Sequence, residues 1–442
     1  MSKLPSSHQA SSLAASAMVL AAITAVYGQD PAKPASTTPA SEPEKSGLGK
    51  FFSDDVPAWI KDGKFSLNAR LRYEYADTTT TSESHAPTLR TRFGYTTGVY
   101  HGFQGMVEGE NISVIGDENN ALYPGNPANG KTVVADPATT ELNQFWLSYS
   151  NWDTTIKGPR QRIVLDNHRF IGDVGWRQNQ QTYDGVLLEN KSIKDVTLTY
   201  AYLAQVNRVF GTENSATVGS ANAAIKGRWQ MESHVINGKW AGSPYANVLG
   251  YAYLLDIDTA PVNSTATYGG SVSGTAKLAE DVSLGYRGEL AWQTDYGNSP
   301  LSYSAPYYHL NATGTLFKRF TVGAGYEVLG SDNNQGFRTP LATLHAFNGW
   351  ADVFLTTPAQ GLRDLYGVLG VTLPGDVPLQ FVYHKFDSDK MSQDYGSEFD
   401  VVISKKFYKN WTAMLKYAHY MGEDAPYAFD VDKFWAQVEF NF

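Results

Sequence analysis

A period-two alternation of apolar and polar residues recurs from residue 65 to the last residue of the chain. In the segment 65–75, apolar side chains occupy every odd position. The even positions hold Ser66, Asn68, Arg70, Arg72 and Glu74. Successive side chains of a strand point to opposite faces, so this pattern predicts strands with one apolar and one charged face. The segments 89–99, 282–293 and 432–442 repeat it.

The alternation and the turn signals together predict about 18 strands. They cover 64–76, 89–101, 102–115, 141–151, 154–166, 180–190, 194–206, 230–240, 245–256, 268–279, 281–293, 307–317, 319–330, 361–373, 377–387, 396–406, 410–421 and 432–442. We expect their connections to alternate strictly between long and short. The long ones include 116–140, 207–229 and 331–360, and the short ones include 152–153, 280, 318 and 407–409.

This spacing favours a transmembrane antiparallel β-barrel, an all-β fold with long extracellular loops and short periplasmic turns. Strands of about 11 residues are long enough to cross a bilayer at a tilt. An even number of strands places both ends of the barrel on the periplasmic side. A soluble β-sandwich shows the same alternation, but nothing in that fold requires long loops at one end and short turns at the other.

Composition excludes several other classes of protein. Only 18% of the residues are charged, against roughly 25% in soluble domains, and Tyr and Gly number 27 and 40. The chain has no cysteine, which excludes disulfides, thiolate metal sites and a cysteine nucleophile. A net charge of −9 argues against a nucleic-acid partner.

The two ends of the chain indicate export to the outer membrane of a Gram-negative cell. Residues 1–28 have the charged start, apolar run and small-residue end of a signal peptide. Residues 29–60 are rich in Pro, Ser and Thr and predict a disordered periplasmic segment, followed by the barrel over residues 61–442. The chain ends on Phe442, the aromatic terminus through which we expect the barrel-assembly machinery to recognise it.

Two segments resemble the alginate-export family of outer-membrane porins. Residues 160–184 (RQRIVLDNHRFIGDVGWRQNQQTYD) are similar to the central signature of that family. The segments 347–358 (FNGWADVFLTTP) and 361–366 (GLRDLY) are similar to its second recurrent block. The resemblance implies a monomeric barrel of 18 strands with a cationic interior, and its best-known function is the outward passage of an anionic uronate polysaccharide. The substrate does not transfer with the fold.

The polar faces of the strands supply candidate pore-lining residues. The arginines expected there, as tentative substrate-binding residues, are Arg70, Arg72, Arg90, Arg92, Arg162 and Arg287. Carboxylates on the same faces are Glu74, Glu108, Glu110, Glu289, Glu327 and Glu439. Rings of arginine select anions, whereas arginine paired with glutamate braces the wall of a barrel and neutralises its lumen. Both interpretations stay open at this stage.

Two predicted external loops, Asn167–Gln178 and Asp332–Gln360, are unusually motif-rich and carry the large aromatic residues Trp176, Phe347, Trp350 and Phe354. Large aromatic side chains are unfavourable in a freely solvated loop. We therefore expect both loops to pack at the mouth of the barrel and to fold inward, narrowing the pore. The residues expected in this role are Arg169, Trp176, Arg177 and Trp350.

The sequence thus predicts an outer-membrane channel that passes anionic or neutral saccharides. The alternative is a general diffusion porin for small solutes, in which the arginine cluster is structural. A barrel enzyme is a third reading, although no H-E-x-x-H or G-x-S-x-G motif occurs. We expect no catalytic residues, cofactor or metal. The expected partners are outer-membrane lipid and lipopolysaccharide, the assembly machinery and the cargo, and we expect a monomer.

Overall fold

The computed structural model describes residues 56–116, 130–211, 226–243 and 245–442. The predicted signal peptide and nearly all of the Pro-rich segment lie outside the described residues. The sheet strands are β1 Lys64–Thr78, β2 Thr81–Thr96, β3 Phe103–Val114, β4 Thr139–Asn151, β5 Thr154–Gln161, β6 Thr182–Asn190, β7 Val196–Asn207, β8 Arg228–Trp240, β9 Asn247–Leu255, β10 Thr265–Ala279, β11 Val282–Asp295, β12 Ser304–Leu316, β13 Phe320–Leu329, β16 Leu362–Leu373, β17 Val377–Asp387, β18 Asp394–Phe407, β19 Trp411–Gly422 and β20 Val431–Asn441.

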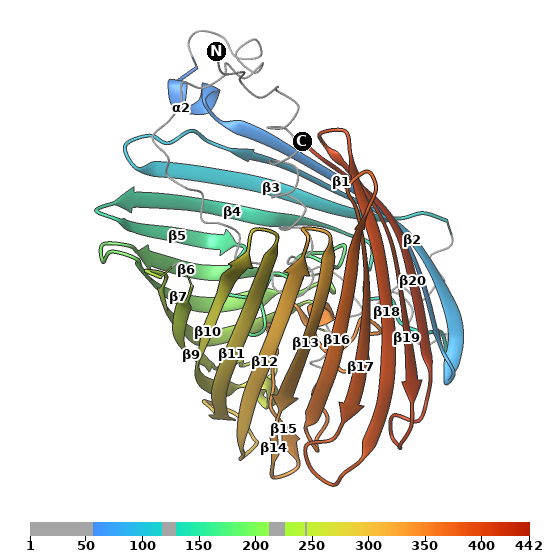
Figure 1. Cartoon of the computed structure of the whole chain (residues 1–442). Helices are drawn as coiled ribbons and strands as arrows, with labels where there is room; N and C mark the ends of the chain where they lie inside the picture. Colours follow the sequence, from blue (N-terminus) through green and yellow to red (C-terminus); the bar gives the residue numbers. More distant parts are fainter. Residues whose placement is uncertain (1–55, 117–129, 212–225, 244) are drawn as a thin grey trace, which may run out of the picture.

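These strands form one 18-stranded antiparallel sheet that closes on itself (Figure 1). The closing pair is β1 with β20, in register from Asn68 opposite Asn441 to Thr78 opposite Val431. Closure leaves no unpaired strand edge, which is the condition for a sheet to exist in lipid. The predicted fold, an antiparallel barrel of about 18 strands, is therefore confirmed.

The largest differences from the predicted strands are at the two ends of β2, which ends at Thr96 rather than residue 101, at the end of β5 and in one connection. β2 begins at Thr81 rather than residue 89, and it pairs with β1 up to Thr78 opposite Thr81. The segment 81–88 (TSESHAPT) contains no large apolar side chain, and its Glu, Ala and Pro are disfavoured in strands, so no apolar alternation is visible there. The expected strict alternation of long and short connections is thus wrong at this hairpin, which has only residues 79–80 between the strands. β5 ends at Gln161 rather than residue 166, because the chain there turns into the barrel.

Among the remaining connections, the short turns lie at one end of the barrel and the long connections lie at the other. The end that holds the start of β1 and the end of β20, here called the terminus end, has short turns such as 152–153, 280–281 and 408–410. The opposite end, here called the loop end, carries the connections 115–138, 162–181 and 330–361. The last of these contains the hairpin β14 Ser331–Asp332 with β15 Gln335–Gly336, which lies far from the C-terminus in Figure 1.

Short helices occur only as single turns in the described residues. They are α2 Ala58–Lys61, η3 Pro261–Asn263 and η4 Leu344–Ala346. No helix in the described part of the chain is long and apolar enough to cross a membrane.

The two faces of the sheet have opposite character. Outward side chains are apolar and exposed, for example Leu290 at 68% and Leu310 at 61%, whereas Arg72 and Glu289 on the inner face are buried. Exposed aromatic residues border this apolar surface near both ends. At the terminus end they include Trp152, Phe317 and Tyr408, and toward the loop end Tyr268, Trp292 and Tyr383. An apolar outer band between aromatic girdles is the surface of an outer-membrane barrel.

Candidate functional site

Two connections from the loop end fold into the barrel and meet inside it. They are 162–181, between β5 and β6, and 330–361, between β13 and β16. Ile171 and Leu341 form a parallel bridge between them. The Thr343 N–H donates to the His168 carbonyl at 3.1 Å, and the Gly172 N–H donates to the Leu341 carbonyl at 2.9 Å. The two connections therefore act as one packed body, which we call the inner loops.

The inner loops supply the apolar core of the barrel. Phe170 packs against Tyr251 and Tyr307 of the wall, with ring centroids 5.3 Å apart in both pairs. Phe354 packs on Phe386 at 4.6 Å. Sandwiching aromatic side chains between loop and wall removes apolar area from water, and this holds the loops inside.

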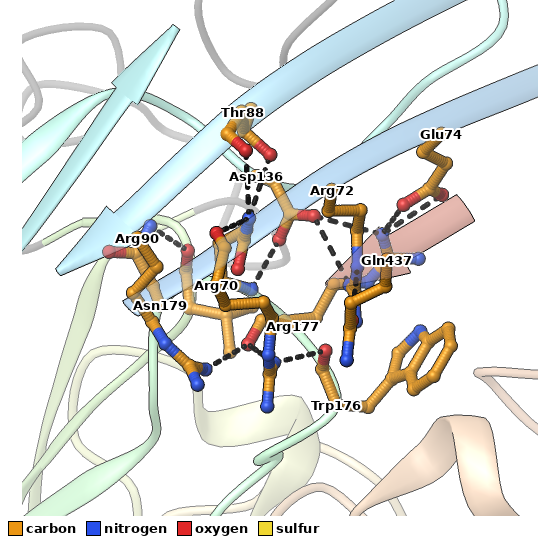
Figure 2. Close-up of polar contacts among 12 residues, drawn as sticks. Arg70, Arg72, Glu74, Thr88, Arg90, Asp136, Trp176, Arg177, Asn179 and Gln437 are labelled. Atoms are coloured by element: carbon orange, nitrogen blue, oxygen red, sulfur yellow. Dashed lines mark hydrogen bonds and ion pairs between the residues drawn. The ribbon is translucent and has the colours of Figure 1, made fainter. Parts of the chain in front are cut away.

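One wall of the lumen is basic and anchors the backbone of the first inner loop. Arg70 on β1 and Arg90 on β2 lie directly opposite each other in the sheet register. The Arg70 Nη1 donates to the carbonyls of Trp176 and Arg177 at 3.1 and 3.3 Å (Figure 2). It also donates to the Gly175 carbonyl at 3.1 Å. These guanidiniums satisfy carbonyls that would otherwise be buried without partners.

Carboxylates offset the charge of this wall. Glu439 on β20 accepts from both facing arginines, from Arg70 Nε at 3.1 Å and Arg90 Nη2 at 3.2 Å. Arg92 pairs with Glu110 of β3. Arg72 approaches Asp136 at 3.7 Å, and its Nη2 donates to Gln437 at 2.6 Å (Figure 2). The mutual repulsion of these arginines is thus compensated within the cluster.

The other two arginines predicted to line the pore are also paired. Arg287 on β11 bonds to Glu289 at 2.8 Å and to Asp166 of the inner loops. Arg162 lies past the end of β5, with its side chain 49% exposed, and pairs with Asp173 at 2.6 Å. All six predicted arginines therefore have a carboxylate within ion-pair distance.

Arg177 of the inner loops reaches the basic wall and joins three acids. Its Nη1 lies 3.0 Å from Glu74 of β1 and 3.7 Å from Asp136 (Figure 2). Its Nη2 lies 2.8 Å from Asp352. Burial alone would lower the pKa of Arg177, but these carboxylates outweigh burial and raise it. Arg177 is a permanent cation that links both inner loops to β1.

Arg169 plays the corresponding part at the opposite wall. Its Nε donates to Glu327 of β13 at 2.7 Å, and its Nη2 donates to Asn348 at 3.0 Å. Its guanidinium carbon lies 4.7 Å above the ring of Phe347. Burial would lower the pKa of Arg169, but Glu327 outweighs burial and raises it. The inner loops are thus tied to both walls of the lumen.

His345, Asp352 and Lys416 form a third attachment, which we call the loop latch. His345 Nδ1 lies 2.7 Å from Asp352 Oδ1, and Lys416 Nζ of β19 lies 2.7 Å from His345 Nε2. Trp176 stacks on His345 at 4.2 Å, and the Lys416 ammonium sits 3.7 Å from the centre of Trp350. Cation–π contacts of this kind are strongest where water is excluded.

The loop latch has a defined protonation pattern. Burial, aided by the Lys416 ammonium, holds the pKa of His345 well below its ordinary value despite Asp352. Burial would raise the pKa of Asp352, but His345, Lys433 and Arg177 outweigh it and lower it. Neutral His345 therefore donates through Nδ1 to ionised Asp352 and accepts at Nε2 from Lys416.

Beneath the inner loops lies a polar cavity of about 320 Å³ at the terminus end. Its lining includes the cations Arg70, Arg90, Arg92 and Arg162 and the acids Glu108, Asp173 and Glu439. Asn68, Gln180 and Asn441 add amide groups. The cavity therefore presents donors and acceptors of both charge signs, and its volume is within the roughly 300–1,000 Å³ of small-molecule sites.

Sequence reasoning did not identify several members of this network. Asp136, Asp352, His345 and Lys416 lie in the lumen, yet none was singled out as a site residue. Only the positions of two of these residues in the sequence could have indicated a role. Lys416 lies on the polar face of a predicted strand, and Asp352 lies within the second family-like block. No three His, Cys, Asp or Glu side chains in the described ranges are placed to hold a metal ion.

A closed barrel with an apolar girdled exterior and a charged, loop-filled lumen defines an outer-membrane channel. The model of the family described as alginate export matches residues 62–208, so the resemblance seen in residues 160–184 is confirmed there. The second family-like block, 347–366, lies beyond the matched residues. The fold indicates an outer-membrane β-barrel channel, and residues 62–208 are similar to the alginate-export family.

Solved structures share this fold at low sequence identity. Pseudomonas aeruginosa OpdQ is 15% identical, with a TM-score of 0.66 over 87% of this chain and 99% of that one. Acinetobacter baumannii OccAB4 is 11% identical, with a TM-score of 0.68 over 88% of this chain and 100% of that one. Pseudomonas aeruginosa OpdK, solved with vanillate, is 12% identical, with a TM-score of 0.68 over 87% and 99%. No curated protein matches the chain significantly.

Proposed function

We propose that this channel passes small anionic or neutral saccharides through the polar cavity at the terminus end. The observation that carries the proposal is the lining of that cavity, where guanidiniums, carboxylates and amides alternate over about 320 Å³. A sugar presents hydroxyls that both donate and accept, so a wall of mixed donors and acceptors suits it. The arginine fork adds bidentate binding of a carboxylate, as a uronate offers.

Two further points support anionic solutes. The family that matches residues 62–208 is described as alginate export, and alginate is an anionic uronate polymer. OpdK, which shares the fold, was solved with vanillate, also a carboxylate. Neither point fixes the cargo, because likeness at this identity concerns the fold.

A general diffusion porin is the second candidate, and one observation favours it. Each of the six arginines first assigned to the pore has a carboxylate partner, and Arg70 also binds loop carbonyls. Arginines used in this way brace the wall, and the lumen is then nearly neutral. Such a pore would discriminate by size more than by charge.

The test replaces Arg90 and Arg92 together by glutamine and measures ion selectivity in planar bilayers. Glutamine is chosen because a glutamate at position 92 would face Glu110. The saccharide channel predicts a lower ratio of anion to cation permeability and weaker block of the current by glucuronate. Arg319→Gln, at a terminus-end turn outside the cavity lining, is the matched control. Unchanged selectivity and block in a properly folded double variant would favour the general porin.

A further inference from the structure

A groove of about 660 Å³ runs across the outer surface of the barrel, centred on β18, β19, β20 and β1, and Val377 of β17, Pro87 of β2 and Ile115 after β3 line its margins. Its walls follow two neighbouring rows of the sheet register. One row is Tyr73, Ala436, Leu415 and Ile403, and the other is Leu71, Val438, Ala413 and Lys405. Adjacent strands lie about 4.8 Å apart, so four strands give the groove a length of about 14 Å.

The groove is hollow because small side chains lie between large ones. Leu71 and Leu415 project outward with 49% and 50% exposure, while the alanines at 413 and 436 leave the sheet uncovered between them. Arg72 and Gln437 also line the groove. The side chains of these two residues form a hydrogen bond with each other inside the barrel, so the groove on the outer face is lined by their backbone atoms.

A lysine lies at the terminus-end margin of this apolar groove. Lys405 is exposed on the outward face of β18, in the row that starts at Leu71. No carboxylate in the described part of the chain lies within ion-pair distance of it. The rings of Phe407 and Trp411 stack beside it at 6.3 Å, at the end of the barrel where the Asn441 N–H bonds to the Asn410 carbonyl.

We propose that this groove binds one anionic glycerophospholipid, with an acyl chain along the groove and its phosphate on Lys405. The outer face of the barrel meets hydrocarbon, which makes an acyl chain the natural occupant of an aliphatic groove. A lysine at the level of the aromatic girdle lies where the headgroups begin. An unpaired ammonium there attracts an anionic headgroup.

We assign the lipid to the periplasmic leaflet, because the terminus end carries the short turns, which face the periplasm in bacterial barrels. This assignment of the groove does not depend on the cargo of the pore. A second copy of the chain would instead cover the Lys405 ammonium with an apolar surface, at the cost of desolvating an unpaired charge.

The experiment is native mass spectrometry of the purified full chain in detergent. Phosphatidylglycerol and phosphatidylcholine with identical acyl chains are the two probes. The wild type is expected to retain one phosphatidylglycerol in preference to phosphatidylcholine. Lys405→Gln is expected to weaken phosphatidylglycerol retention about fivefold, the effect of about 1 kcal/mol per lysine at a membrane surface. Lys318→Gln is the control, because Lys318 is a turn lysine already paired with Asp281 at 2.8 Å.

A second variant tests the groove separately from the charge. Ala436→Phe fills it and is expected to reduce retention of both lipids, whereas Val322→Phe, on the outer face of β13, is not. Heat-modifiable gel mobility confirms that each variant is a folded barrel. Equal retention of the two lipids by the wild type, no change in Lys405→Gln, or a lipid-free dimer would overturn the proposal.

Discussion

The ammonium of Lys416 on β19 lies 2.7 Å from Nε2 of His345, within the loop that enters the barrel from β13. His345 in turn contacts Asp352, seven residues further along the same loop. A neutral imidazole can accept from the ammonium and donate to the carboxylate at the same time, whereas an imidazolium has no acceptor for Lys416. The loop is therefore held to the wall by a histidine that must stay neutral.

This arrangement predicts that acid loosens the inner loops. Free histidine has a pKa of about 6.5, and in the latched state the pKa of His345 lies well below that. A released loop takes up a proton that the latched loop does not, so the latch loses stability as pH falls from about 6.5 toward the depressed pKa. Planar-bilayer recordings should show more conductance fluctuation at pH 5 than at pH 7.5.

His345→Gln is the variant that isolates this effect. Glutamine can donate and accept but does not titrate, so the pH dependence of the fluctuations between pH 7.5 and 5 should largely disappear. His85 is half exposed at the loop-end hairpin and contacts Glu83, outside the lumen. His85→Gln should leave the pH dependence intact. Equal pH dependence in wild type and His345→Gln would contradict the assignment.

A second prediction concerns the ion pair that ties the first inner loop to β1. Arg177→Met removes a buried cation from Glu74, Asp136 and Asp352. Leaving buried carboxylates without a partner costs about 3–5 kcal/mol. We expect the loop to detach from β1 and the single-channel conductance to rise. The gel mobility of the variant should still shift on heating, because the barrel itself stays folded.

The double variant Arg177→Met with Glu74→Gln separates charge from packing. Glu74→Gln removes one of the carboxylates that Arg177→Met leaves without a partner, so it should restore part of the lost attachment of the loop. The effects of the two changes on conductance should therefore not be additive. Conductance in the double variant that is no lower than in Arg177→Met would show that the ion pair does not hold the loop.

The strands and the faces of their side chains could be predicted because both are local properties of the sequence. Once alternation places Leu71 outward, Arg70 and Arg72 must point inward, and the register then sets Arg70 opposite Arg90. The predicted strand that begins at residue 89 misses the first eight residues of β2, because Pro87 is a poor strand former and the segment 81–88 has no large apolar side chain to show the alternation.

The contacts inside the lumen could not be predicted in the same way. Arg177 meets Glu74 across 103 residues of sequence, and Lys416 meets His345 across 71. Nothing local to Asp352 shows which cation it will face, because that depends on how two loops fold together inside a closed barrel. The sequence indicates that the two loops are unusual, but it does not indicate which carboxylates form ion pairs with their arginines.

A third prediction tests the lipid face. Leu310 projects outward from the middle of β12 and is 61% exposed, whereas Thr313 alternates to the inner face. Arginine on the lipid face near the bilayer midplane costs about 2–4 kcal/mol. Leu310→Arg should reduce the amount of assembled barrel, measured by heat-modifiable mobility, and Thr313→Arg should be tolerated. Equal assembly of the two variants would mean that this outer face does not meet lipid.

The last prediction concerns the orientation of the barrel, on which the leaflet of the bound lipid also depends. The chain lacks cysteine, so a single introduced thiol can be labelled without background. Asn334 lies in the β14–β15 hairpin at the loop end, and Lys409 lies in the turn between β18 and β19 at the terminus end. On intact cells an impermeant maleimide should label Asn334→Cys and should not reach Lys409→Cys until the outer membrane is permeabilised. Long loops outside and short turns inside are the arrangement expected of a bacterial barrel. Labelling of Lys409→Cys alone on intact cells would invert the barrel, and it would move the Lys405 groove to the opposite leaflet.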